Sequence, residues 1–111
     1  MNHNDILTEL NLLIHKLDSI IDIMLQSTKE IIDTGNVNYQ LKKIIDKLDV
    51  IIDSLDDSNE KSMLETAKYD VTFATTDLID DTDIFEKISK LRDAKNALVV
   101  IRSKLDIKGH L

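Results

Sequence analysis

Apolar residues recur in the N-terminal half of the chain at the period of an α-helix. Between residues 10 and 24 successive apolar positions are 3, 1, 3, 3, 1 and 3 residues apart, and the same spacing returns between residues 41 and 55. Such spacing forms a stripe about 100° wide, which is typical of a helix that packs against several neighbours. The two stripes consist of Leu10, Leu13, Ile14, Leu17, Ile20, Ile21 and Met24, and of Leu41, Ile44, Ile45, Leu48, Ile51, Ile52 and Leu55.

The two stripes belong to an internal sequence repeat with an offset of 31 residues. Residues 14–22 and 45–53 are identical at seven of nine positions. The pattern predicts one helix over residues 4–34 and a second over residues 37–57. Gly35 can close the first helix in a left-handed conformation and Asn36 can cap the second, so we expect an antiparallel hairpin with facing stripes. Because the stripes are so similar, the sequence leaves open whether they pair within one chain or between two copies.

A third helix is predicted from the spacing of Asp57 and Glu60, which is that of a capping box. Residues 69–76 also alternate at the period of a β-strand. A lone strand would have no partner to pair with, so we expect helix there. The apolar stripe of this third helix is smaller than the first two and consists of Leu64, Ala67, Val71, Ala74 and Leu78.

Asp83 and Glu86 repeat the capping-box spacing and predict the start of a fourth helix, which Gly109 ends. Its stripe consists of Ile84, Ile88, Leu91, Leu98, Ile101 and Leu105. We therefore predict an all-α protein, an antiparallel four-helix bundle built on a repeated helical hairpin (residues 4–57) plus two further helices. The prediction treats residues 1–111 as a single domain.

The composition favours helices and excludes several kinds of functional site. The chain has no proline and only two glycines, which is too few for the tight turns of a β-rich fold. It has no cysteine, so disulfides, thiolate zinc sites and cysteine nucleophiles are excluded. The longest apolar run, residues 97–101, is too short to span a membrane, and the first residues lack the pattern of a secretory signal. We expect a soluble, cytoplasmic protein.

Charge is unevenly distributed along the chain, whose net charge is −7. Residues 57–83 contain two basic and eight acidic residues, whereas residues 84–111 contain seven basic and three acidic residues. Opposite charges could face each other within the bundle, or one patch could steer a protein partner. The candidate partner-binding residues are Asp77, Asp80, Asp81, Asp83, Lys87, Lys90, Arg92 and Lys95.

Carboxylates three residues apart raise the question of a magnesium site. Asp46 with Asp49, and Asp53 with Asp56, have a spacing similar to that of all-helical nucleotide pyrophosphatases, whose carboxylates converge inside the bundle. Here the helical pattern places them on the outward side of the second helix, where they are expected to be solvated. His15 lacks a second histidine ligand nearby. We therefore predict no catalytic residue, metal or cofactor.

The length, helical class and acidity are similar to those of bacteriocin immunity proteins and of small inhibitors encoded by phages and plasmids, although no shared motif supports this likeness. The favoured interpretation is a non-enzymatic module, an inhibitor, immunity or regulatory protein that binds another protein and is either monomeric or a homodimer. A small all-helical magnesium-dependent nucleotide-processing enzyme is one alternative. Nucleic-acid binding through the basic fourth helix is another, disfavoured because the chain is acidic and offers no aromatic platform for bases.

Overall fold

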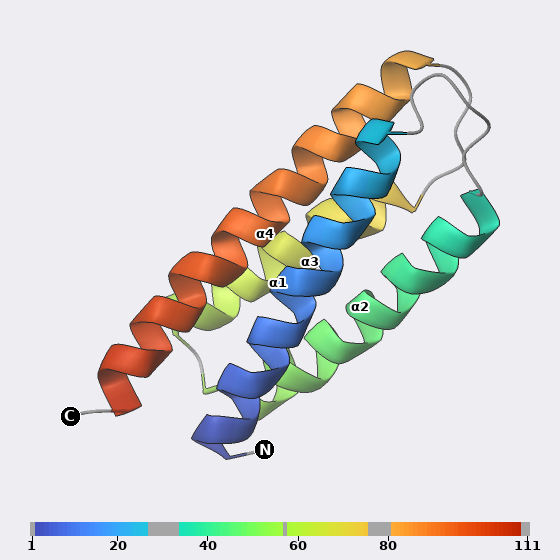
Figure 1. Cartoon of the computed structure of the whole chain (residues 1–111). Helices are drawn as coiled ribbons and strands as arrows, with labels where there is room; N and C mark the ends of the chain where they lie inside the picture. Colours follow the sequence, from blue (N-terminus) through green and yellow to red (C-terminus); the bar gives the residue numbers. More distant parts are fainter. Residues whose placement is uncertain (1, 27–33, 57, 76–80, 110–111) are drawn as a thin grey trace.

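The described residues form an antiparallel bundle of four α-helices, which confirms the predicted fold class (Figure 1). The structure is a computed structural model and describes residues 2–26, 34–56, 58–75 and 81–109. In chain order the helices are α1 (His3–Gln26), α2 (Thr34–Ser54), α3 (Asn59–Ala74) and α4 (Asp81–Gly109). The start of α1 and the end of α4 lie toward the same end of the bundle.

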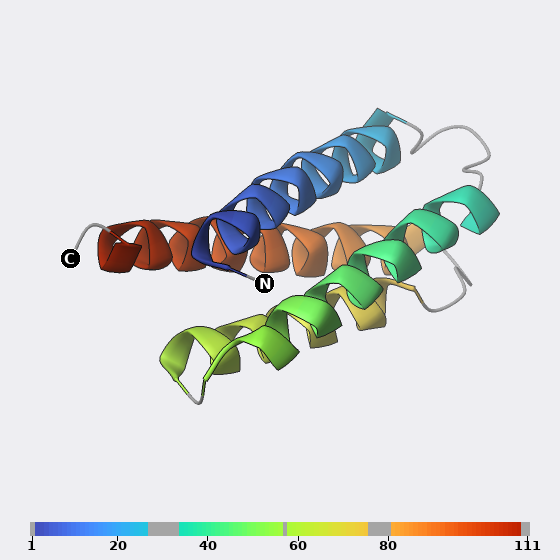
Figure 2. The same ribbon diagram turned by 90° about the horizontal axis from the view of Figure 1, so that it is seen from below.

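The helices contact one another mainly in the order α1, α4, α3, α2, and each is antiparallel to the next (Figure 2). The most extensive contacts join α3 to α4, followed by α1 to α4 and α2 to α3, whereas α1 and α2 contact each other only sparsely. The expectation that α1 and α2 pair closely with facing stripes is therefore wrong. Both stripes point into the common core. α1 packs mainly against α4, and α2 packs mainly against α3.

The core consists of the predicted apolar stripes. Every stripe residue of α1 is buried, as are those of α3 that the structure describes and all of α4 except the half-buried Ile84. In the second stripe the burial is less complete, because Ile45 of α2 and Leu55, which directly follows α2, are only partly buried. Their repeat equivalents in α1, Ile14 and Met24, are buried. The sequence repeat is therefore packed asymmetrically, with α1 more deeply embedded than α2.

The link between the first two helices differs from the expected turn. α2 begins at Thr34, so Gly35 and Asn36 lie in its first turn and do not separate the two helices. The apolar stripe of α2 is one turn longer than predicted, since Val37 lies four residues before Leu41 and is buried. The described part of α1 ends at Gln26, and the predicted continuation over residues 27–33 lies outside the described residues.

Helix α3 begins one residue later than the capping box of Asp57 and Glu60 predicts. The N-cap is Ser58, whose backbone is extended and whose side chain accepts a hydrogen bond from the Lys61 backbone N–H at 3.3 Å. Asp57 itself lies outside the described residues. The helical assignment of residues 69–74 is confirmed, and α3 ends at Ala74.

Helix α4 begins at Asp81, three residues earlier than the capping box of Asp83 and Glu86 predicts, and includes Gly109 as its last residue. Its first turn contains Asp81 and Asp83, a place where acidic residues are favourable because the N-terminus of a helix carries partial positive charge. Among the described residues, no helix is both long enough and apolar enough to cross a membrane.

Candidate functional site

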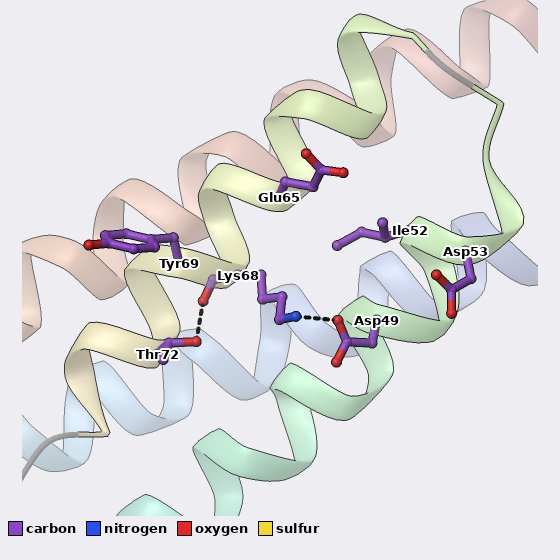
Figure 3. A pocket seen from close by; sticks show the side chains of 7 residues that line it. All are labelled: Asp49, Ile52, Asp53, Glu65, Lys68, Tyr69 and Thr72. Atoms are coloured by element: carbon purple, nitrogen blue, oxygen red, sulfur yellow. Dashed lines mark hydrogen bonds and ion pairs between the residues drawn. The ribbon is translucent and has the colours of Figure 1, made fainter.

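A groove between α2 and α3 gathers charged and aromatic side chains on the surface of the bundle (Figure 3). Its volume is about 560 Å³. We refer to it as the acidic groove. It is lined by Asp49, Ile52 and Asp53 of α2 and by Glu65, Lys68, Tyr69 and Thr72 of α3.

Helical geometry explains why these residues meet. Asp49, Ile52 and Asp53 are three and four residues apart, so they share one face of α2. The four lining residues of α3 are also three, four or seven residues from the first of them, so they share one face of α3 over two turns. Because α2 and α3 are antiparallel neighbours, the two faces lie side by side, and the buried Ile52 forms an apolar floor between the charged groups.

An ion pair crosses the acidic groove. The Lys68 Nζ lies 2.6 Å from the Asp49 Oδ1, and Figure 3 shows the lysine reaching from α3 to α2. The hydrogen bond that Lys68 donates to Asp49 raises the pKa of Lys68 above its ordinary value. Desolvation opposes this rise, and the charges of Asp49, Asp53 and Glu65 add to it. Both partners are solvent-exposed, so the pair adds little stability. It does show that this surface attracts a cation.

The acidic groove also presents an aromatic side chain to solvent. Tyr69 is 75% exposed, whereas the neighbouring Thr72 hydroxyl donates to the backbone carbonyl of Lys68 at 2.8 Å. A tyrosine offers an apolar ring with a polar tip, and its face can bind a cation. The arrangement is an open surface that combines negative charge, an apolar floor and one aromatic ring, which are the properties of a binding site for a basic group.

The acids predicted to form a docking surface cannot be placed against this groove. Asp77 and Asp80 lie outside the described residues. Asp81 and Asp83 belong to the first turn of α4, and their side chains are likewise outside what the structure describes. Their role in partner binding stays a prediction.

The predicted basic residues of α4 do not all share one surface, although Arg92 and Lys95 line the same hollow. Lys87 is only 3% exposed, so a partner could not contact it directly. Lys90 places its ammonium 6.0 Å from the centre of the Phe73 ring on α3. Lys95 points to the other side and pairs with Asp18 of α1 at 2.7 Å, while Arg92 is exposed. Opposite charges thus face each other across α1 and α4, as one of the two interpretations of the charge pattern predicts.

The carboxylates of α2 lie on the outer side of the helix, as expected, where Asp46, Asp53 and Asp56 are exposed. Over the described ranges no group of three or more histidine, aspartate or glutamate side chains is arranged to hold a metal ion. The exposure of Asp46 and Asp53 agrees with the surface position that the sequence pattern predicts. The pattern missed their neighbours on α3, because only the antiparallel register of α2 and α3 brings Tyr69 and Glu65 beside them.

Comparisons with protein-family models, curated proteins and solved structures give no match.

Proposed function

We propose that this chain is a non-enzymatic interaction module that binds a basic segment of another protein in the acidic groove. It would act as an inhibitor, immunity or regulatory protein by covering that segment. The observation that supports the proposal best is the gathering of Asp49, Asp53 and Glu65 around a single lysine, next to an exposed tyrosine.

Charge favours a basic partner. The groove contributes three carboxylates and one ammonium, and the chain carries a net charge of −7. The Lys68–Asp49 pair is a model within the chain for how a lysine or arginine of a partner would bind. Negative potential over the groove would also accelerate association with a basic segment, and added salt would screen this effect.

Tyr69 supplies the apolar part of the contact. Exposed tyrosines are over-represented among the residues that contribute most to protein–protein binding, because they bury a large rigid area at low entropic cost. A lysine or arginine bound over the ring would place its hydrocarbon stem toward the apolar floor formed by Ile52. A groove between two antiparallel helices is elongated, so a helix or an extended segment fits it better than a small molecule does.

The test uses a synthetic helical peptide that carries arginine and leucine on one face, with a second peptide in which every arginine is replaced by glutamate. Amide resonances of the isotope-labelled chain are followed by NMR during titration with each peptide. We expect the arginine peptide to shift the resonances of Lys68, Tyr69 and Asp49 most strongly. The glutamate peptide should leave them unchanged.

Two variants of the chain test whether the peptide binds in the acidic groove. Glu65→Lys reverses one charge inside the groove, whereas Glu86→Lys makes the same change at an exposed position of α4. Glu65→Lys should weaken binding of the arginine peptide at least tenfold, and Glu86→Lys should have a much smaller effect. Equal losses in the two variants would show that the peptide responds only to overall charge, and the proposed site would be wrong.

A further inference from the structure

The outer face of α1 carries apolar side chains that the bundle does not bury. Leu12 and Ile23 are each 48% exposed. They border a hollow of about 320 Å³ between α1 and α2, which is also lined by Lys16 and Ser19 of α1 and by Asn36 and Gln40 of α2. None of the described residues that line it is a carboxylate, although the chain is strongly acidic. We refer to this surface as the α1 face.

The internal repeat shows that the fold does not require these apolar residues. With the offset of 31 residues, Leu12 corresponds to Lys43 of α2 and Ile23 corresponds to Ser54, and both of these residues are exposed. The same helical positions are therefore polar in one copy of the repeat and apolar in the other. At these positions α2 presents polar side chains to solvent, whereas α1 presents apolar side chains that a partner could cover.

The α1 face is complementary to itself in an antiparallel arrangement. Leu12 and Ile23 are eleven residues apart, which brings them to within about 20° of each other around the helix. If two α1 helices lie antiparallel with a two-fold axis between residues 17 and 18, Leu12 meets Ile23 of the partner subunit and Lys16 meets Ser19 of the partner subunit. Each apolar residue then covers another, and where both opposed residues belong to the described part of α1, no two like charges lie directly opposite.

We propose that the α1 face binds the α1 face of a second copy and forms a symmetric, antiparallel dimer. The repeated stripes are already buried within one chain, so this interface does not require them to open. Because the described residues of its lining include no carboxylate, they place no acid against an acid of the second copy, although each chain carries a charge of −7. Two half-exposed residues per copy bury a small area, so the dimer is weak and depends on concentration.

The dimer does not depend on the proposed binding of a basic segment. Asn36 and Gln40 lie on the flank of α2 that faces α1, whereas Asp49 and Asp53 lie on the flank that faces α3. Both acidic grooves therefore stay open in the dimer. Failure of either proposal leaves the other standing.

The molar mass in solution, measured by analytical ultracentrifugation over a wide range of concentration, tests the dimer. We expect the mass to rise from 12.7 kDa toward twice that value as concentration increases. The double variant Leu12→Lys, Ile23→Ser carries the residues found at the equivalent positions of α2 and should stay monomeric. Val50→Ser is the matched control, because Val50 is 49% exposed and its repeat equivalent is Ser19, and it should dimerise as the parent does.

Circular dichroism shows that each variant is folded, and cysteine cross-linking tests the register. The chain has no cysteine, so a mixture of Leu12→Cys and Ile23→Cys variants should form the mixed disulfide in preference to either symmetric one. A parent chain that is monomeric at every concentration would refute the dimer and leave the α1 face to a different protein. A folded double variant that dimerises as well as the parent, or a predominance of symmetric disulfides, would also overturn the proposal.

Discussion

Two isoleucines at equivalent positions of the repeat should contribute unequally to stability. Ile14 of α1 is 5% exposed, whereas its counterpart Ile45 of α2 is only partly buried. The reason is the packing of the bundle, in which α1 lies along the longest helix, α4, and α2 lies along the shorter α3. Replacing each isoleucine by alanine therefore compares the same chemical change in two different environments.

The expected losses follow from the burial of each side chain. Replacing a fully buried isoleucine by alanine typically costs about 2–5 kcal/mol, so we expect Ile14→Ala to lower the free energy of unfolding by about 3 kcal/mol. Ile45→Ala removes fewer contacts and leaves a space that solvent can reach, so its loss should be about half as large. Alanine favours helix over isoleucine to the same degree at both positions, and this contribution cancels in the comparison.

Leu17 and Leu48 provide the internal reference. They are also repeat equivalents, and both are completely buried, so their alanine variants should lose the same free energy to within about 1 kcal/mol. Urea unfolding followed by circular dichroism gives all four values, provided that the slope of each transition is unchanged. Equal losses for Ile14→Ala and Ile45→Ala would refute the packing described above. They would favour instead the symmetric hairpin that the repeat alone predicts.

Four further variants test other parts of the structure by the same urea assay. Lys87→Glu should destabilise the chain by about 3 kcal/mol, because it places a carboxylate where a buried ammonium lies. Arg92→Glu, at an exposed site, should change the stability by less than about 0.5 kcal/mol. Similar losses for the two variants would mean that Lys87 is not buried. Ser58→Ala should cost about 1 kcal/mol through loss of the N-cap of α3, and an unchanged stability would argue against the cap. Burial raises the pKa of Asp70, with Asp93 adding to the effect and Lys90 opposing it. The folded chain therefore holds this proton to higher pH than the unfolded chain, so the benefit is present at acid pH and is lost as pH rises through the folded pKa. Asp70→Asn should accordingly raise stability by up to about 0.5 kcal/mol at neutral pH and have no effect in acid, and the opposite pH dependence would contradict this.

The sequence was sufficient to predict the helices and the core, because a stripe repeated at helical spacing indicates both which segments are helical and which residues are buried. It could not predict which helices pair. A stripe of a given width fits any apolar neighbour, and Leu17 and Leu48 would be buried in several arrangements. Helix ends were also ambiguous. Asp57 and Ser58 are adjacent and both are good N-caps, so only the backbone conformation identifies Ser58 as the cap.

The candidate site was less predictable than the fold. The difference in charge between residues 57–83 and 84–111 led to the prediction of a partner-binding surface that includes the basic residues of α4. In the structure Lys95 contacts Asp18, and Lys90 lies over Phe73. The burial of Lys87 could have been predicted from the sequence pattern, since Lys87 lies three residues after Ile84 and four before Leu91, within the apolar stripe. The acidic groove could not, because it depends on the register between α2 and α3.

Photo-cross-linking at the acidic groove tests the proposed function most directly. Tyr69 is replaced by a photoreactive phenylalanine derivative in cells that express the chain, and Phe85, which is also exposed, serves as the control position on α4. We predict that position 69 cross-links to a protein through a segment rich in lysine and arginine, that Glu65→Lys abolishes the product, and that position 85 does not give it. A product that survives Glu65→Lys, that maps to an acidic segment or that forms only at position 85 would contradict the proposal.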